Sequence, residues 1–122
     1  MDDEDLVRNI AGKILKYLGY EVKLSKDGED AIEQFKKARK SGRPFDAVIL
    51  DLTIPGGMGG KDTIEKLREI NKEIRAIISS GYSEDPIISD YRDYGFSGVV
   101  SKPYTTEQLS EVLHDVLSRK IL

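Results

Sequence analysis

Apolar residues recur along the chain with two alternating patterns. Spacings of three and four residues predict amphipathic helices, and continuous or alternating apolar runs between them predict strands. The helical segments are residues 6–18, 31–40, 64–70, 87–94 and 109–117. The strand segments are residues 22–24, 47–50, 76–78 and 98–101. Helix and strand therefore alternate from one end of the chain to the other.

This alternation predicts an α/β fold with a doubly wound parallel sheet covered by helices on both faces. No repeat or linker interrupts it, and 122 residues fit one domain over 1–122. In such sheets the ligand site lies beyond the carboxyl ends of the strands. Polar side chains at those positions are therefore candidates for a functional site.

Polar residues stand at the expected strand ends. Asp51 closes the 47–50 run, Ser80 ends the 76–78 strand, and Lys102 follows the last strand. Asp2 and Asp3 directly precede the first helix, where another strand would end. Taken singly, these residues read as turn formers, helix caps or surface charges. Because parallel strands end at one edge of the sheet, we expect them to converge there.

The amino-acid composition limits the reactions in which these strand-end residues could take part. The chain has no cysteine and a single histidine, so thiol catalysis, disulfides and sites with two histidines are excluded. A metal would have oxygen ligands, which favours Mg²⁺, Ca²⁺ or Mn²⁺. Three clustered carboxylates repel one another unless a cation joins them or one is protonated. A carboxylate can itself be a nucleophile and form an aspartyl phosphate. The set therefore suits Mg²⁺-dependent phosphoryl transfer to an aspartate.

The charge balance limits the partners. With 19 basic and 22 acidic residues, the net charge is -3, which argues against direct binding of nucleic acid or of an anionic membrane. No apolar run is long enough to span a membrane. The chain opens with Met-Asp-Asp-Glu-Asp, unlike a signal peptide. These features together predict a cytoplasmic protein.

The chain resembles the receiver domains of two-component response regulators. The motifs are Asp2-Asp3, the segment 48–52 followed by Pro55-Gly56, the segment 78–81, and the segment 101–103. Each motif is weak alone, but their order and spacing together are specific. The resemblance implies a flavodoxin-like (βα)5 fold with strand order 2-1-3-4-5. The 51–60 loop most resembles receivers attached to, or partnered with, hybrid sensor histidine kinases.

The resemblance implies a role for each site residue. Asp51 would accept a phosphoryl group from a phosphohistidine on a sensor histidine kinase or a histidine phosphotransfer protein. Asp3 and Asp51 would bind Mg²⁺ directly, Asp2 would act mainly through water, and the Thr53 backbone carbonyl would complete the protein ligands. The protein would not be an enzyme beyond its own phosphorylation and dephosphorylation.

The resemblance also implies a switch. Ser80 and Lys102 would bind the phosphoryl group, and the Lys102-Pro103 peptide would be cis. The surface formed by 87–94, the last strand and the last helix would then contact an output protein or kinase domain. The family usually carries an aromatic residue where this chain has Val99; Tyr104 and Tyr82 are candidates to replace it.

The first strand of the family is missing here, because only Met1 precedes the acidic pair. Three explanations are open. Upstream residues are lost from the sequence, the tail 119–122 supplies the strand, or another chain supplies it by swapping, which would give a homodimer.

Two other functions compete with the phospho-accepting switch. A hydrolase of the haloacid dehalogenase class needs a second acidic residue two positions after its nucleophile, and Thr53 stands there instead. A degenerate receiver that serves only as a protein-interaction module would lack an essential site residue. All of these residues are present, which favours the phospho-accepting switch.

Overall fold

A parallel sheet of three strands lies at the centre of the computed structural model, which describes residues 1–81 and 86–118. The strands are β1 (Val48–Asp51), β2 (Ala76–Ser80) and β3 (Gly98–Ser101), in the order β1-β2-β3. Asp51 pairs with Ser79, and Ser80 pairs with Ser101. The register therefore aligns the carboxyl ends of all three strands at one edge, as the sequence predicts.

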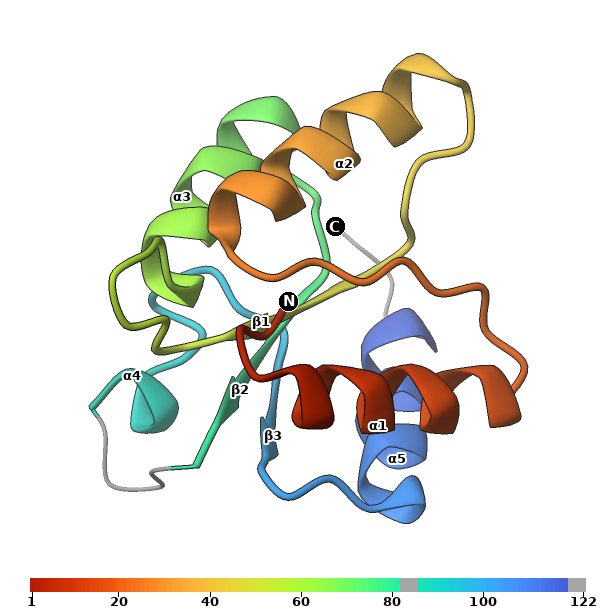
Figure 1. Cartoon of the computed structure of the whole chain (residues 1–122). Helices are drawn as coiled ribbons and strands as arrows, with labels where there is room; N and C mark the ends of the chain where they lie inside the picture. The colour runs from red at the N-terminus through yellow and green to blue at the C-terminus, as the bar shows by residue number, and fades with distance from the viewer. Residues whose placement is uncertain (82–85, 119–122) are drawn as a thin grey trace.

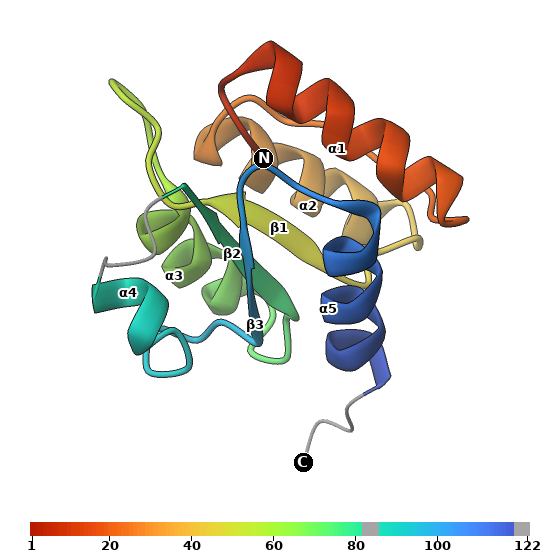
Figure 2. The ribbon, with the colours of Figure 1, turned by 90° about the horizontal axis from the view of Figure 1, so that it is seen from below.

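Helices cover both faces of this sheet (Figures 1 and 2). They are α1 (Asp5–Tyr17), α2 (Gly28–Lys40), α3 (Gly60–Ile70), the short α4 (Pro86–Ser89) and α5 (Thr106–Ser118). α2 and α3 pack together on one face, whereas α1 and α5 lie on the other. The Asp27 carboxylate caps α2 by accepting a hydrogen bond from the Asp30 N–H. This arrangement confirms the predicted α/β fold.

The alternation of side chains along β2 divides the core into two clusters. Ile78 packs with Phe35, Ile64 and Leu67 on the α2–α3 face. Ile77 points the other way and packs with side chains of β3 and α5, namely Val100, Leu109, Leu113 and Val116. β2 is buried along its whole length, which explains why its sequence is a continuous run without polar alternation.

Two predicted elements are wrong. Residues 22–24 form no strand. A strand needs a backbone neighbour, but the hydrogen bond that the structure gives to Leu24 comes from the Gln34 side chain, and the Asp2 N–H bonds the Ser25 carbonyl, just beyond the segment. The predicted helix over 87–94 is helical only over Pro86–Ser89. After Asp90, which still bonds the Pro86 carbonyl, the next backbone hydrogen bonds join residues three apart, from the N–H groups of Asp93, Tyr94 and Gly95. The apolar spacing of 87–94 is therefore that of a turn region.

The place of the first strand is held by Met1 alone. The Met1 ammonium donates to the Ile49 carbonyl, with the nitrogen and oxygen 2.7 Å apart. The Asp51 N–H donates back to the Met1 carbonyl at 3.0 Å. The observed strands are thus the last three of the five expected. The tail 119–122, proposed as a replacement strand, lies outside the described residues.

Glycines let the loop after β1 close tightly on the strand. A Cβ at Gly59 would lie 2.4 Å from the Leu52 carbonyl oxygen, and one at Gly60 would lie 2.9 Å from the Asp51 carbonyl oxygen. Backbone oxygens cannot move aside as the end of a side chain can. The loop is therefore held against β1.

Replacing Gly59 by Ala should destabilise the protein, because the added methyl group collides with the Leu52 carbonyl oxygen. We expect the free energy of unfolding to fall by about 1–3 kcal/mol, measured by urea denaturation. Gly81→Ala is the matched control, since a Cβ there meets nothing within 4 Å, and it should stay within about 0.5 kcal/mol of the parent. Equal effects of the two substitutions would contradict this account.

Candidate functional site

The parallel register brings the predicted site residues to one edge of the sheet. Asp51 and Ser80 are the last residues of β1 and β2, and Lys102 directly follows β3. The Lys102 N–H also donates to the Ser80 carbonyl at 3.0 Å, which ties the end of β3 to the end of β2. Asp2 and Asp3 arrive from the other end of the chain, immediately before α1.

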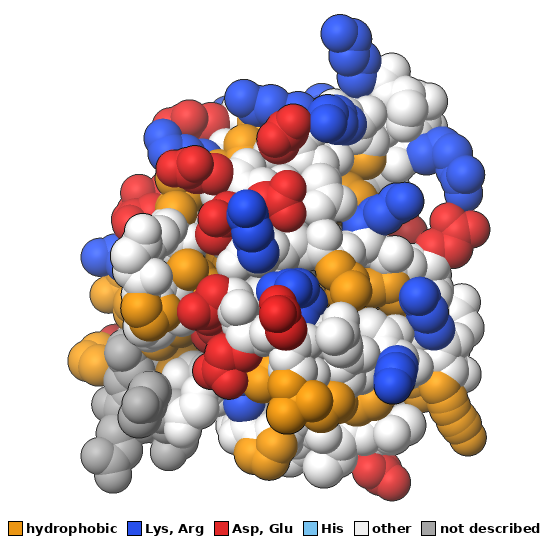
Figure 3. Space-filling view, in the orientation of Figure 1, with side chains coloured by type: hydrophobic (Ala, Val, Ile, Leu, Met, Phe, Trp, Pro, Cys, Tyr) orange, Lys and Arg blue, Asp and Glu red, His pale blue; other side chains and the backbone are white. Residues whose placement is uncertain are grey.

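Three carboxylates meet at this edge. One oxygen each from Asp2, Asp3 and Asp51 lies within 4.8 Å of the others. Asp2 and Asp51 are each only 3% exposed, whereas Asp3 is exposed. In Figure 3 acidic side chains gather on the same face, near the start of α1. The site thus has two buried acids and one acid open to solvent.

Lys102 bridges the two buried carboxylates. Its Nζ lies 3.3 Å from Asp2 Oδ2 and 3.2 Å from Asp51 Oδ2. Burial alone would lower the pKa of the Lys102 ammonium, but the attraction of Asp51 and Asp2 outweighs burial and raises that pKa. Lys102 is therefore a fixed positive charge at the centre of the site.

Asp51 is held in an environment that disfavours its charge. Burial, followed by repulsion from Asp2, raises the pKa of the Asp51 carboxyl, although Lys102 and the Thr53 N–H partly oppose this. Burial likewise lowers the pKa of the Met1 amino group to about 6. The local charge is thus incompletely balanced, and an additional cation near Asp51 would stabilise the carboxylates.

The donor set fits Mg²⁺. The site offers carboxylate oxygens with no nitrogen or sulfur ligands among the described residues, and hard divalent cations prefer oxygen. The exposed position of Asp3 leaves a side on which water could complete the coordination. Thr53 is exposed and its N–H bonds the Asp51 carboxylate; a ligand role for its carbonyl stays a prediction.

Sequence reasoning missed a hydroxyl pair beneath the site. The Ser79 and Tyr104 hydroxyls are hydrogen-bonded to each other, and burial raises the pKa of Tyr104. Tyr104 packs on the α1–α5 face, whereas Val99 packs on the α2–α3 face, so Tyr104 does not occupy the space next to Val99. Because 25 residues separate Ser79 from Tyr104 along the chain, no local sequence pattern indicates that their hydroxyls meet. The Lys102-Pro103 peptide is cis, as predicted.

Comparison with known proteins identifies the family. The sequence model described as "Response regulator receiver domain" matches residues 1–114. The chain therefore belongs to the response regulator receiver domain family. Receiver domains are signalling modules of two-component systems that interact with kinases and phosphotransfer proteins and bind Mg²⁺ at an acidic pocket.

Individual relatives agree with this assignment. The chain is 26% identical to sporulation initiation phosphotransferase F of Bacillus subtilis, covering 98% of this chain and 92% of that protein. It is 28% identical to sensor kinase CckA of Brucella abortus over 98% of this chain, but spans only 12% of that kinase. The solved structure of Vibrio cholerae chemotaxis protein CheY4 aligns with a TM-score of 0.84 at 27% identity, covering 95% of this chain and 93% of that one.

The helices that the structure describes include none long and apolar enough to cross a membrane.

Asp51→Asn should stabilise the metal-free protein at neutral pH. Because the pKa of Asp51 is raised on folding, its carboxylate opposes folding at any pH above that pKa, and the penalty disappears as the pH falls below the ordinary value of 3.8. With EDTA present, we expect the midpoint of thermal unfolding to rise by about 2–5 °C at pH 7 and the gain to vanish near pH 3.8.

The control is Asp93→Asn, which replaces an exposed aspartate outside the site and should leave the midpoint unchanged at both pH values. A lower midpoint for Asp51→Asn at pH 7 would show that its ion pair with Lys102 outweighs burial and repulsion.

Proposed function

We propose that this receiver domain accepts a phosphoryl group on Asp51 from a phosphohistidine, in a Mg²⁺-dependent reaction that switches a protein-binding face. The observation that supports this most directly is the convergence of Asp51, Asp2 and Lys102 at one edge of the sheet, with Lys102 bridging both carboxylates. An ion pair that served only to stabilise the fold would need one carboxylate, whereas this site buries two carboxylates beside Lys102.

Asp51 is the nucleophile in this proposal. One carboxylate oxygen attacks the phosphorus atom, the bond from phosphorus to the donor imidazole nitrogen breaks, and the imidazole leaves and takes up a proton. The attacking group must be ionised. Lys102 and the Thr53 N–H support that form against the burial that opposes it.

Lys102 and Ser80 would hold the transferred group. The Lys102 ammonium stands 3.2 Å from Asp51 Oδ2, where a phosphoryl group on Asp51 would add negative charge. Ser80 is buried at the end of β2 and offers a hydroxyl. Asp2, Asp3, Asp51 and the Thr53 carbonyl would hold Mg²⁺, which supplies positive charge for the phosphoryl oxygens.

The partners are a sensor histidine kinase or histidine phosphotransfer protein as donor, and an output protein or kinase domain as receiver of the signal. The relatives include both a sensor kinase and a phosphotransferase. We place the protein in the cytoplasm, where such donors act. The alternative of a degenerate receiver that only binds partners is weakened because no site residue is missing.

Incubation with Mg²⁺ and acetyl phosphate should add one phosphoryl group to the protein, because the nucleophile and its charge partners are in place. Intact-mass spectrometry measures the gain. EDTA and Asp51→Asn should each abolish it, whereas Asp93→Asn should retain it. A folded parent protein that gains no mass would support the degenerate receiver instead.

Removal of the bridging ammonium should slow phosphorylation. For Lys102→Ala we expect a rate lower by about 10²-fold, the loss typical of one preorganised charge at a reacting centre, measured as the time course of the mass gain. Lys66→Ala removes an exposed lysine on α3 away from the site and should react at the parent rate. Equal rates for the two variants would exclude a role for Lys102 in the reaction.

A further inference from the structure

The residues that follow β3 are attached to the end of β2 at two points. The Lys102 N–H donates to the Ser80 carbonyl, with the nitrogen and oxygen 3.0 Å apart. Two residues further on, the Tyr104 hydroxyl is hydrogen-bonded to the Ser79 hydroxyl. The segment 102–104 is therefore tied to two consecutive residues of β2, once through its backbone and once through a side chain.

The Ser79 hydroxyl lies on the same face of the sheet as the Asp51 carboxylate. Ser79 pairs with Asp51 in the register of β1 and β2, and residues paired in this way point to the same face. Ile77 packs on the α1–α5 face, and Ser79, two residues later, points to that face as well. Tyr104 also packs there. The hydroxyl pair thus lies directly beside the acidic site.

The pair is buried, and the charges of the site act on it. Ser79 has 0% exposed surface. Burial raises the pKa of the Tyr104 hydroxyl, the bond to Ser79 opposes this, and the charges of Asp2, Lys102 and Asp51 contribute as well. The Tyr104 hydroxyl is therefore within electrostatic range of all three charged groups.

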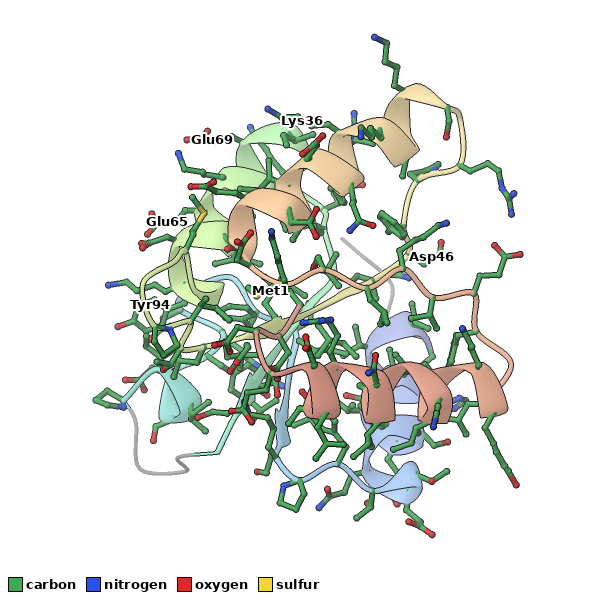
Figure 4. All side chains as sticks on the ribbon, viewed as in Figure 1. Met1, Lys36, Asp46, Glu65, Glu69 and Tyr94 are labelled. Carbon is green, nitrogen blue, oxygen red and sulfur yellow. The ribbon has the colours of Figure 1, made fainter. Side chains whose placement is uncertain are left out.

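The position of the Lys102 ammonium depends on how firmly its backbone is held. Its Nζ lies 3.3 Å from Asp2 Oδ2 and 3.2 Å from Asp51 Oδ2. Figure 4 shows Met1, the residue before Asp2, next to β1, so the ammonium stands where the N-terminal segment meets that strand. A lysine side chain has a flexible four-carbon stem. A fixed starting point therefore favours one end position for the charge.

The hydroxyl of Tyr104 is what fixes this starting point beyond simple packing. A phenylalanine ring would fill the same space, but a buried tyrosine hydroxyl needs a partner. Among the described residues, no buried side-chain polar atom lacks a hydrogen-bond partner. The bond to Ser79 thus favours one position of the Tyr104 ring, and with it one position of the backbone at 102–104.

We propose that the Ser79–Tyr104 hydroxyl pair is a positioning pair for phosphoryl transfer, which holds the segment 102–104 so that the Lys102 ammonium stays beside Asp51. This role rests on the proposed function, because it is there that Lys102 acts on the group transferred to Asp51. Neither hydroxyl touches the reacting atoms; both act through Lys102.

Tyr104→Phe keeps the ring and removes the hydroxyl. With Mg²⁺ and acetyl phosphate, we expect phosphorylation to slow by about fivefold, the effect of losing one neutral hydrogen bond, measured as the time course of the mass gain. Tyr20→Phe is the matched control, because Tyr20 is another partly buried tyrosine of the same cluster, and it should react at the parent rate. A parent rate for Tyr104→Phe would overturn the positioning role.

The double substitution of Ser79→Ala and Tyr104→Phe separates positioning from stability. A buried hydroxyl left alone lowers stability, whereas removal of both partners is nearly neutral. We expect the double variant to unfold within about 2 °C of the parent midpoint, yet to stay about fivefold slower in phosphorylation. A return to the parent rate would mean that the pair only stabilises the fold, which would overturn the proposal.

The route through Lys102 is tested by adding Tyr104→Phe to Lys102→Ala. No further loss of rate is expected, because the ammonium that the pair positions is already absent. An equal loss in both backgrounds would show that the hydroxyl acts by another route, against the proposal. A folded parent protein that gains no phosphoryl group would overturn the proposed function itself, and the positioning role with it; that result is seen before any substitution is made.

Discussion

The in-register pairing of three parallel strands is the constraint on which the rest of the structure depends. It fixes Asp51 beside Ser79 and Ser80 beside Ser101, so residues far apart in sequence end at one edge. Helices on both faces bury β2 completely, which prevents the register from slipping. A shift of one residue would turn Ile77 and Ile78 toward the wrong clusters. The packing of the core therefore determines the geometry of the site.

The site holds charged carboxylates in a buried position, and burial disfavours their charge. Asp2 and Asp51 are nearly inaccessible to solvent, and among the described side chains a single ammonium, that of Lys102, bridges them. Their carboxylates are costly to keep ionised so close together. An added positive charge near the two carboxylates would lower that cost. The chain belongs to the receiver family, whose members bind Mg²⁺ at an acidic pocket. The excess of negative charge at this site agrees with that property.

The sequence was sufficient to predict those site residues that stand at the ends of strands. Asp51, Ser80 and Lys102 each follow a continuous apolar run, so their convergence could be predicted. Residues 22–24 could not be judged in this way, because their alternating pattern is that of a strand, whereas the described part of the chain gives them no backbone strand to pair with. The helix at 87–94 failed because periodicity does not distinguish a helix from successive turns. The Ser79–Tyr104 pair depends on tertiary packing, which single-sequence patterns do not encode.

The ion pair between Asp2 and Lys102 joins residues 100 positions apart. Contacts within β1, β2 and β3 close much shorter loops, and short loops cost less entropy to close. On this ground we expect the sheet to form first, and the acidic site to be complete only after the N-terminal segment has docked. A partly folded molecule would carry Asp51 without Asp2, and its competence for signalling would depend on the last step of folding.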